Sequence, residues 1–286
     1  MYLIPHHHGA VLVECGPGST IAALQDGLRT HGYTPADITD VLLTHIHLDH
    51  GGAAGWLARQ GSRIHVHPHG APHLANPEKL LASAARIYGE MMEFLWGKFL
   101  PVPEARLSIL QDGDTLEIGG VSIRAIETPG HANHHHVYRF EQTLFTGDIG
   151  GVRLGGQRIV GLPMPPPEFH LENWRVSLER LRQEVETGEL RYIAPTHFGL
   201  YDDPDWHLSA IGRGLYEVEE WMRNVMVSNP DLDELRRKFI DWTRTNLEKQ
   251  GVDPAHFSAI EAANPAFMSA DGILRYWKKF VDNTAN

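Results

Sequence analysis

Residues 44–50 constrain the fold most, because five side chains able to bind a metal occur within the seven residues Thr-His-Ile-His-Leu-Asp-His. The residues before them are mostly apolar and β-branched, which predicts a buried strand, and two glycines after them allow a tight turn into a helix. Alternate side chains of an extended segment share a face, so His45 and His47 are expected to point the same way. After the turn, Asp49 and His50 can face a second point. This layout favours two adjacent metal ions over one.

Three later segments repeat the pattern of a metal-binding side chain next to glycine or proline, each just beyond a predicted strand. They end at His131 in Thr-Pro-Gly-His, at Asp148 in Thr-Gly-Asp and at His197 in Pro-Thr-His. A single histidine is more often a hydrogen-bonded structural residue than a ligand. Loops at strand ends are where a rigid scaffold holds catalytic groups, and several such motifs together are hard to explain by chance.

With these residues the chain resembles the metallo-β-lactamase superfamily over about residues 10–199. The resemblance implies an α/β fold, a four-layer αβ/βα sandwich with a two-metal site on one edge. It also implies which residues bind each ion. The first ion would be bound by His45, His47 and His131, and the second by Asp49, His50 and His197, with Asp148 bridging the pair.

The ligand types indicate the same chemistry. Neutral imidazole and carboxylate groups suit zinc, iron or manganese, and we expect two divalent ions, with zinc as the first choice. Two ions about 3.5–4 Å apart can share a hydroxide that attacks a carbonyl or phosphorus centre. Asp49 is the predicted catalytic residue, because it can orient the water and later carry a proton while also binding a metal.

Composition limits the partners and the compartment. The formal net charge of −11 argues against non-specific binding to nucleic acid or to an anionic membrane. Cys15 is the single cysteine, so no disulfide forms within the chain, and a buried apolar role is expected for it rather than a nucleophilic one. We see no signal peptide and no stretch of about 20 apolar residues, so the predicted location is cytoplasmic.

The expected organisation is a catalytic domain at 1–200, with a helical insertion at 77–101, followed by a helical C-terminal extension at 201–286. The insertion is rich in Met and aromatic residues; packing on the core is the first expectation and a substrate wall the second. Strands are predicted at 10–14, 38–43, 63–67, 107–110, 115–118, 121–127, 136–140, 143–145 and 191–194. Helices are predicted at 19–31, 53–59, 171–185, 208–227, 232–248 and 273–282.

Other candidate residues receive weaker predictions. Four histidines between residues 65 and 73 lack a neighbouring carboxylate in sequence and are expected to be structural or surface residues: His65, His67, His69 and His73. His134, His135 and His136 follow His131 closely and are candidates for supporting the ligands or contacting substrate. Glu14 stands where many relatives carry the Asp of an Asp-x-Gly motif, and we assign it no role. The proline-rich segment 161–167 is expected to be a stiff loop near the site.

Three functions remain at this stage. The first is a hydrolase of a small ester, thioester or lactone, in a branch like glyoxalase II or the lactonases. The alternative is a phosphodiesterase or nuclease of ribonuclease Z type, which would need a basic groove or an RNA-binding arm that the sequence lacks. The third is a non-catalytic or redox protein, which the complete ligand set disfavours. A small molecule is the expected partner, and the C-terminal extension could act as a cap or form a homodimer contact.

Overall fold

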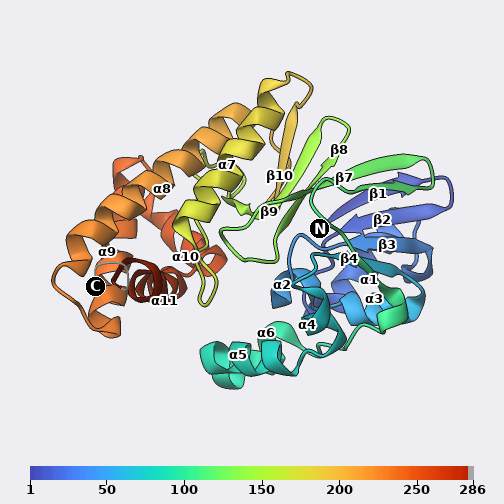
Figure 1. The fold of residues 1–286 in the computed structure, drawn as a ribbon, viewed down its shortest axis with the longest axis horizontal. Helices are drawn as coiled ribbons and strands as arrows, with labels where there is room; N and C mark the ends of the chain where they lie inside the picture. Colours follow the sequence, from blue (N-terminus) through green and yellow to red (C-terminus); the bar gives the residue numbers. More distant parts are fainter. Residues whose placement is uncertain (283–286) are drawn as a thin grey trace. The chain divides into compact units, whose positions relative to one another are not determined.

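The structure is a computed structural model that describes residues 1–282. It divides into two compact units, which are described here one at a time (Figure 1). The first unit comprises residues 1–127 and 134–141, and the second comprises residues 128–133 and the chain from residue 142 on.

The first unit contains a five-stranded sheet in the order β1-β2-β3-β4-β5. Its strands are β1 (Tyr2–His6), β2 (Gly9–Val13), β3 (Ile38–Leu42), β4 (Arg63–Val66) and β5 (Leu107–Ile109). The β1–β2 pair is antiparallel and the other pairs are parallel. Helices α1 (Ile21–Thr30) and α3 (Ala54–Gln60) bury apolar residues against this sheet. The buried residues of β3 are Ile38, Val41 and Leu42, as expected for a strand covered by helices.

The same unit holds short helices and an antiparallel meander. Helix α2 (Leu48–Gly51) directly follows the loop after β3, and α4 (Ala71–Ala75), α5 (Glu78–Tyr88) and α6 (Met92–Trp96) form the segment before β5. Tyr88, Met92 and Trp96 of this segment pack against the core, whereas Phe94 is 76 % exposed. The meander consists of β6 (Thr115–Ile118), β7 (Val121–Glu127) and β8 (His136–Phe140).

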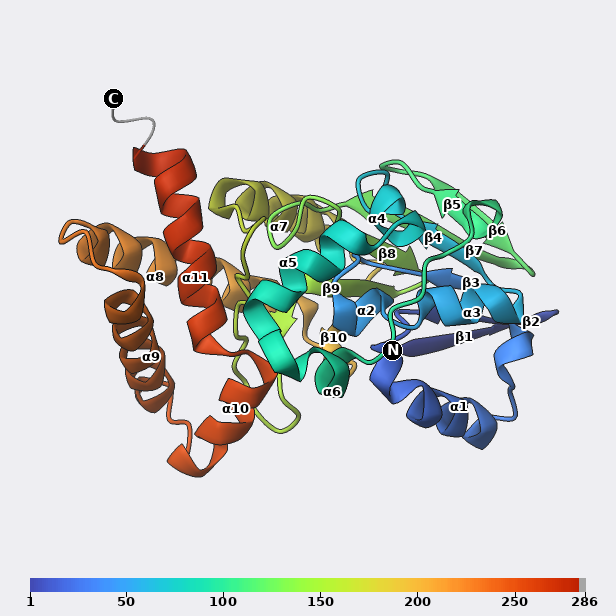
Figure 2. The same cartoon turned by 90° about the horizontal axis from the view of Figure 1, so that it is seen from below.

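The second unit combines two parallel strands with the C-terminal helices. Strands β9 (Thr143–Val152) and β10 (Tyr192–His197) pair in parallel, and helices α7 (Leu171–Glu186) and α8 (Pro204–Met226) pack on each other and on β9. Helix α7 buries one face at helical spacing, including Trp174, Leu178 and Leu181. Helices α9 (Leu232–Lys249), α10 (Phe257–Ala263) and α11 (Ala266–Tyr276) follow, and α11 lies against α9 (Figure 2).

Most predicted elements are confirmed within a few residues, and the differences have simple causes. Strand β1 and helix α10 were not predicted, because β1 contains Pro5 and α10 lies between two proline-containing breaks at residues 253–254 and 264–265. Strand β9 continues to Val152, well past the predicted end at residue 145, because its glycines at 147, 150 and 151 weaken the strand pattern in the sequence. Helix α11 begins at Ala266 rather than at residue 273. No helix within residues 1–282 is long and apolar enough to cross a lipid bilayer.

Candidate metal centre

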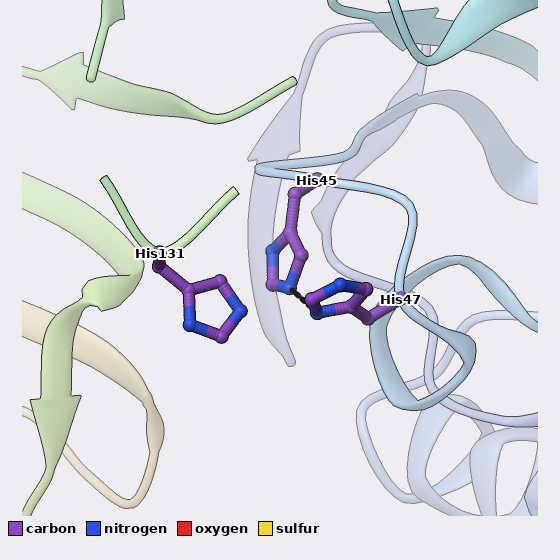
Figure 3. Close-up of side chains that lie close together, drawn as sticks. All are labelled: His45, His47 and His131. Atoms are coloured by element: carbon purple, nitrogen blue, oxygen red, sulfur yellow. Dashed lines mark hydrogen bonds between the residues drawn. The ribbon is translucent and has the colours of Figure 1, made fainter. Parts of the chain in front are cut away.

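In the first unit, the loop that follows β3 brings the rings of His45 and His47 together. The Nε2 atom of His45 and the Nδ1 atom of His47 are 3.0 Å apart (Figure 3). The Oγ1 atom of Thr44 lies 3.1 Å from Nδ1 of His45, which orients the buried ring so that Nε2 points to His47. The two imidazole nitrogens therefore converge on one point.

The next pair, Asp49 and His50, lies on helix α2 of the same unit. Nε2 of His50 is 3.4 Å from Oδ2 of Asp49, and its Nδ1 is 3.2 Å from Oε2 of Glu14. The other oxygen of Glu14 accepts the backbone N–H of Thr44 at 2.9 Å. The contact lacks hydrogen-bond geometry, but the negative charge of Glu14 on this side of the ring favours the tautomer of His50 with the proton on Nδ1. The lone pair of Nε2 then faces the side on which Asp49 lies.

In the second unit, His131 follows β7 and is drawn with the two histidines of the first unit in Figure 3. Its Nδ1 lies 2.8 Å from the carbonyl oxygen of Pro163. A carbonyl cannot donate, so Nδ1 carries the proton and Nε2 offers the lone pair. Gly130 has a φ of +149°, and a Cβ at this position would lie 2.5 Å from the Cα of Trp174. Only glycine allows this approach between the loop of His131 and helix α7.

Asp148 lies between two histidines of the second unit. Its Oδ2 is 3.4 Å from Nε2 of His131, and its Oδ1 is 3.4 Å from Nε2 of His197. The expectation that Asp148 and His197 lie beyond their strands was wrong, since Asp148 is inside β9 and His197 is the last residue of β10. The glycines around Asp148 hid the continuation of β9 in the sequence.

These distances suit a divalent metal ion. Zinc–nitrogen bonds of about 2.0–2.1 Å at a tetrahedral angle place neighbouring ligand atoms roughly 3.3 Å apart. The His45–His47 pair is at 3.0 Å, and the Asp49–His50 pair is at 3.4 Å. Both contacts of Asp148 are also at 3.4 Å. The donor set of imidazole nitrogens and carboxylate oxygens therefore fits such ions in each unit taken by itself.

A partly buried ion pair supports the end of β10 and was not predicted. Arg153 binds Asp203 through two hydrogen bonds of 2.6 and 3.1 Å, and its guanidinium lies 3.9 Å from the centre of the Tyr201 ring. The backbone N–H of Arg153 donates to the carbonyl of His197 at 2.7 Å. The partners are about fifty residues apart in the chain, so no local pattern in the sequence could have revealed them.

The remaining histidines form separate groups in the first unit. His65 lies 2.7 Å from Asp40 and His67 lies 3.1 Å from Glu127, so both have carboxylate partners that are distant in sequence. Burial lowers the pKa of His136 to about 3, and this ring packs on that of His67. The expectation of a structural role thus agrees with the contacts of His65 and His67.

His134 and His135 both lie near a predicted ligand. Their rings stack on that of His45, with ring centres 6.1 Å (His134) and 5.1 Å (His135) from its centre.

Cys15 is fully buried, and its thiol donates to the carbonyl of His50 at 3.1 Å. Burial raises the pKa of the Cys15 thiol, which disfavours the thiolate that a nucleophile would need.

Comparison with known proteins defines the family. The family model of the Metallo-beta-lactamase superfamily matches residues 1–197 of this chain. Among curated proteins, the metallo-beta-lactamase fold-containing protein ST1585 of Sulfurisphaera tokodaii is 27 % identical over 197 residues, which is 66 % of this chain and 72 % of ST1585. The chain belongs to the metallo-beta-lactamase superfamily.

Solved structures show the same fold. The protein TTHA1429 of Thermus thermophilus, a metallo-beta-lactamase family protein, superposes with a TM-score of 0.67 at 22 % identity, covering 97 % of this chain and 87 % of that chain. The predicted α/β metallo-β-lactamase fold is thereby confirmed.

One further relative in sequence, the atrochrysone carboxyl ACP thioesterase of Aspergillus fumigatus, is 33 % identical over 113 residues, which is 39 % of this chain and 27 % of the thioesterase. The chain spans 61 % of the length of its mycobacterial relatives.

Proposed function

We propose that this chain is a dinuclear metal-dependent hydrolase that cleaves a small ester, thioester or lactone. In this proposal one ion is bound by His45, His47 and His131, and the other by Asp49, His50 and His197. Asp148 would be shared by the two ions. The assignment follows the resemblance of the motif to the superfamily, to which the chain belongs.

The observation that carries the proposal is the orientation of Asp148. Each of its two carboxylate oxygens faces a different histidine at 3.4 Å, as a carboxylate shared by two ions requires. The first unit shows a matching division, because His45 pairs with His47 whereas His50 pairs with Asp49. These contacts support the grouping in the proposal, and the rings of His45 and His50, with centres 3.9 Å apart, bring the two groups next to each other.

Two bound divalent ions would supply an acidified water as the nucleophile and a Lewis acid for the substrate oxygen. Asp49 is suited to handle the proton, because its side chain is 32 % exposed while that of His50 beside it is fully buried. In this role its carboxylate accepts a hydrogen bond from the attacking water and then passes the proton to the leaving group. His50 is oriented by Glu14, and His131 by the carbonyl of Pro163.

Three observations favour a carbonyl substrate. One relative, from Aspergillus fumigatus, is named an ACP thioesterase, and a thioester is a carbonyl substrate. The net charge of −11 disfavours a polyanionic substrate such as RNA. Tyr88 of the helical insertion lies within electrostatic range of Asp49, since the charge of Asp49 adds to burial in raising the pKa of Tyr88. In the proposal this side chain would contact a small substrate bound beside Asp49.

Several features stay predictions within this proposal. They are the identity of the metal, the glyoxalase II-like or lactonase-like branch, the division of the chain at residue 200, a homodimer and a cytoplasmic location. None of them changes the test of the reaction itself.

The test is turnover by protein loaded with zinc, manganese or iron on a panel of thioesters, acyl lactones and phosphodiesters. Asp49→Ala serves as the inactive control, with metal content and melting temperature measured in parallel. Removal of metal by a chelator should abolish activity and lower the melting temperature, since ligands that bind only the folded state stabilise it.

Selective cleavage of a carbonyl substrate that disappears in Asp49→Ala supports the proposal. Cleavage of phosphodiesters alone would replace it with the ribonuclease Z-like alternative. An unchanged kcat/KM in folded, metal-loaded Asp49→Ala would refute the role given to Asp49.

A further inference from the structure

A cavity of about 690 Å³ lies within the second unit, among the C-terminal helices. Its lining residues come from α8, α9, α10 and α11 and from the segment that follows β9. Figure 2 shows where these helices lie. All residues that line it belong to this unit. Sites for small molecules occupy about 300–1,000 Å³, so the cavity has the size of a ligand site rather than of a packing defect.

The cavity wall is mostly apolar. Large apolar side chains line it from different elements: Ile159, Leu162, Phe239, Trp242, Ile260 and Phe267. A protein interior normally packs to crystal-like density, and an apolar space this large would forfeit dispersion contacts if no molecule filled it. The wall therefore suits a ligand with a substantial apolar part.

One polar atom marks where the ligand would make a hydrogen bond. The hydroxyl oxygen of Thr243 is buried at the cavity wall and has no hydrogen-bond partner within residues 1–282. A buried hydroxyl left without a partner is destabilising by about 1–3 kcal/mol, and a ligand that bonds to it removes this penalty. The polar part of the ligand is thus expected beside Thr243.

The charges at the wall disfavour an ionic ligand. Glu261 lines the cavity and accepts the backbone N–H of Ala266 at 3.0 Å. Burial raises the pKa of Glu261, and the positive charge of Arg244 acts against this shift. Arg244 is exposed, so the wall offers no buried cation to an anionic head group. For a cationic head group, the second acidic residue of the wall, Glu217, is exposed to solvent and Arg244 offsets the charge of Glu261.

We propose that this cavity binds an uncharged, mainly apolar molecule with one hydrogen-bonding group, such as a long-chain alcohol or ester, beside Thr243. The site is separate from the proposed metal ligands but adjoins a segment that orients one of them. Leu162 and Met164 line the cavity, and Pro163 between them accepts the hydrogen bond from His131. A ligand in the cavity contacts both neighbours of Pro163.

The test measures binding directly, so its outcome does not depend on whether the proposed hydrolase activity is correct. Metal-loaded full-length protein is titrated with 1-decanol, decanoate or decylammonium, each below its aggregation concentration. Binding is followed by calorimetry, by the shift in melting temperature and by tryptophan fluorescence, for which Trp242 in the wall is a local reporter. We expect 1-decanol to bind most tightly and to raise the melting temperature.

Three variants locate the site. Ile260→Trp adds bulk at the wall and should weaken 1-decanol binding at least about tenfold. Ala259→Trp introduces the same side chain one position earlier on α10, at an exposed residue that does not line the cavity, and should bind as the parent protein does. Thr243→Val keeps the shape but removes the hydroxyl, which should weaken binding about threefold to tenfold.

Absence of 1-decanol binding, or an equal loss in the Ile260→Trp and Ala259→Trp variants, would overturn the proposed site. Tighter binding of decanoate or decylammonium than of 1-decanol would overturn the assignment to an uncharged ligand. If Ile260→Trp fails to fold, Thr243→Val still decides, because unchanged affinity in that variant contradicts the proposed hydrogen bond.

Discussion

Glu14 and His50 form a buried pair in which the carboxylate Oε2 lies 3.2 Å from the ring Nδ1. The other carboxylate oxygen accepts the N–H of Thr44, so Glu14 connects the two ends of the histidine-rich loop. Glu14 holds this position with a φ of +66°, which is uncommon for a residue other than glycine. The strain indicates that the surrounding structure fixes the residue here.

We expect Glu14→Gln to weaken metal binding. Partners that hold a ligand histidine typically contribute about tenfold to a hundredfold in metal affinity or activity, and the amide no longer selects the tautomer of His50. The measurement is metal content after dialysis against a graded series of chelator concentrations. The matched control is Glu141→Gln, because Glu141 also has a positive φ but is exposed. Equal metal retention in both variants would contradict the role of Glu14.

Asp148→Ala should lower the metal content of the protein more than His131→Ala or His197→Ala does. If Asp148 bridges two ions, its loss weakens both, whereas His131→Ala and His197→Ala each weaken one. We expect a fall in kcat/KM of at least about a thousandfold for Asp148→Ala, because a metal contributes several kcal/mol to the reaction. Metal-to-protein ratios are measured by elemental analysis on the folded variants. A ratio for Asp148→Ala equal to those of the two histidine variants would argue against bridging.

Local patterns in the sequence predicted most strands and helices and the seven candidate ligands, whereas the fold followed from the resemblance to the superfamily. The run before residue 44 has the apolar character of a buried parallel strand, and the spacing of His45 and His47 follows from strand geometry. The supporting residues could not be predicted in this way. The acceptor for His131 is a backbone carbonyl of Pro163, which any residue type carries, and Arg153 meets Asp203 only through the tertiary fold.

The Arg153–Asp203 pair should stabilise the second unit. Asp203→Asn leaves the buried guanidinium without its counter-charge, and breaking such a pair is destabilising by about 3–5 kcal/mol when both partners are buried. Because the Asp203 side chain is 25 % exposed, we expect about 2–3 kcal/mol. Denaturant unfolding measures the change, with Asp202→Asn at the exposed neighbouring position as the control. Equal free energies of unfolding for the two variants would show that the pair contributes nothing.

His207 should make the protein less stable as the pH falls below 6.5. Burial lowers its pKa from 6.5 to about 4, opposed by its hydrogen bond to the carbonyl of Gly150 and assisted by the charge of Arg153. Above pH 6.5 the imidazole is neutral in both the folded and unfolded states, so its contribution is fully present. Between pH 6.5 and 4 the unfolded state binds a proton that the folded state does not, which favours unfolding by up to about 3 kcal/mol in total. Below pH 4 both states are protonated and the dependence ends.

His207→Gln isolates this effect, because the glutamine amide can still donate to the carbonyl of Gly150 but does not titrate in this range. We expect the free energy of unfolding of this variant to fall less steeply between pH 6.5 and 4 than that of the parent protein. His256→Gln, at an exposed histidine, should keep the parent slope. Chemical denaturation at half-unit pH intervals measures all three proteins. Parallel curves for the parent protein and His207→Gln would show that His207 is not the group responsible for the loss of stability.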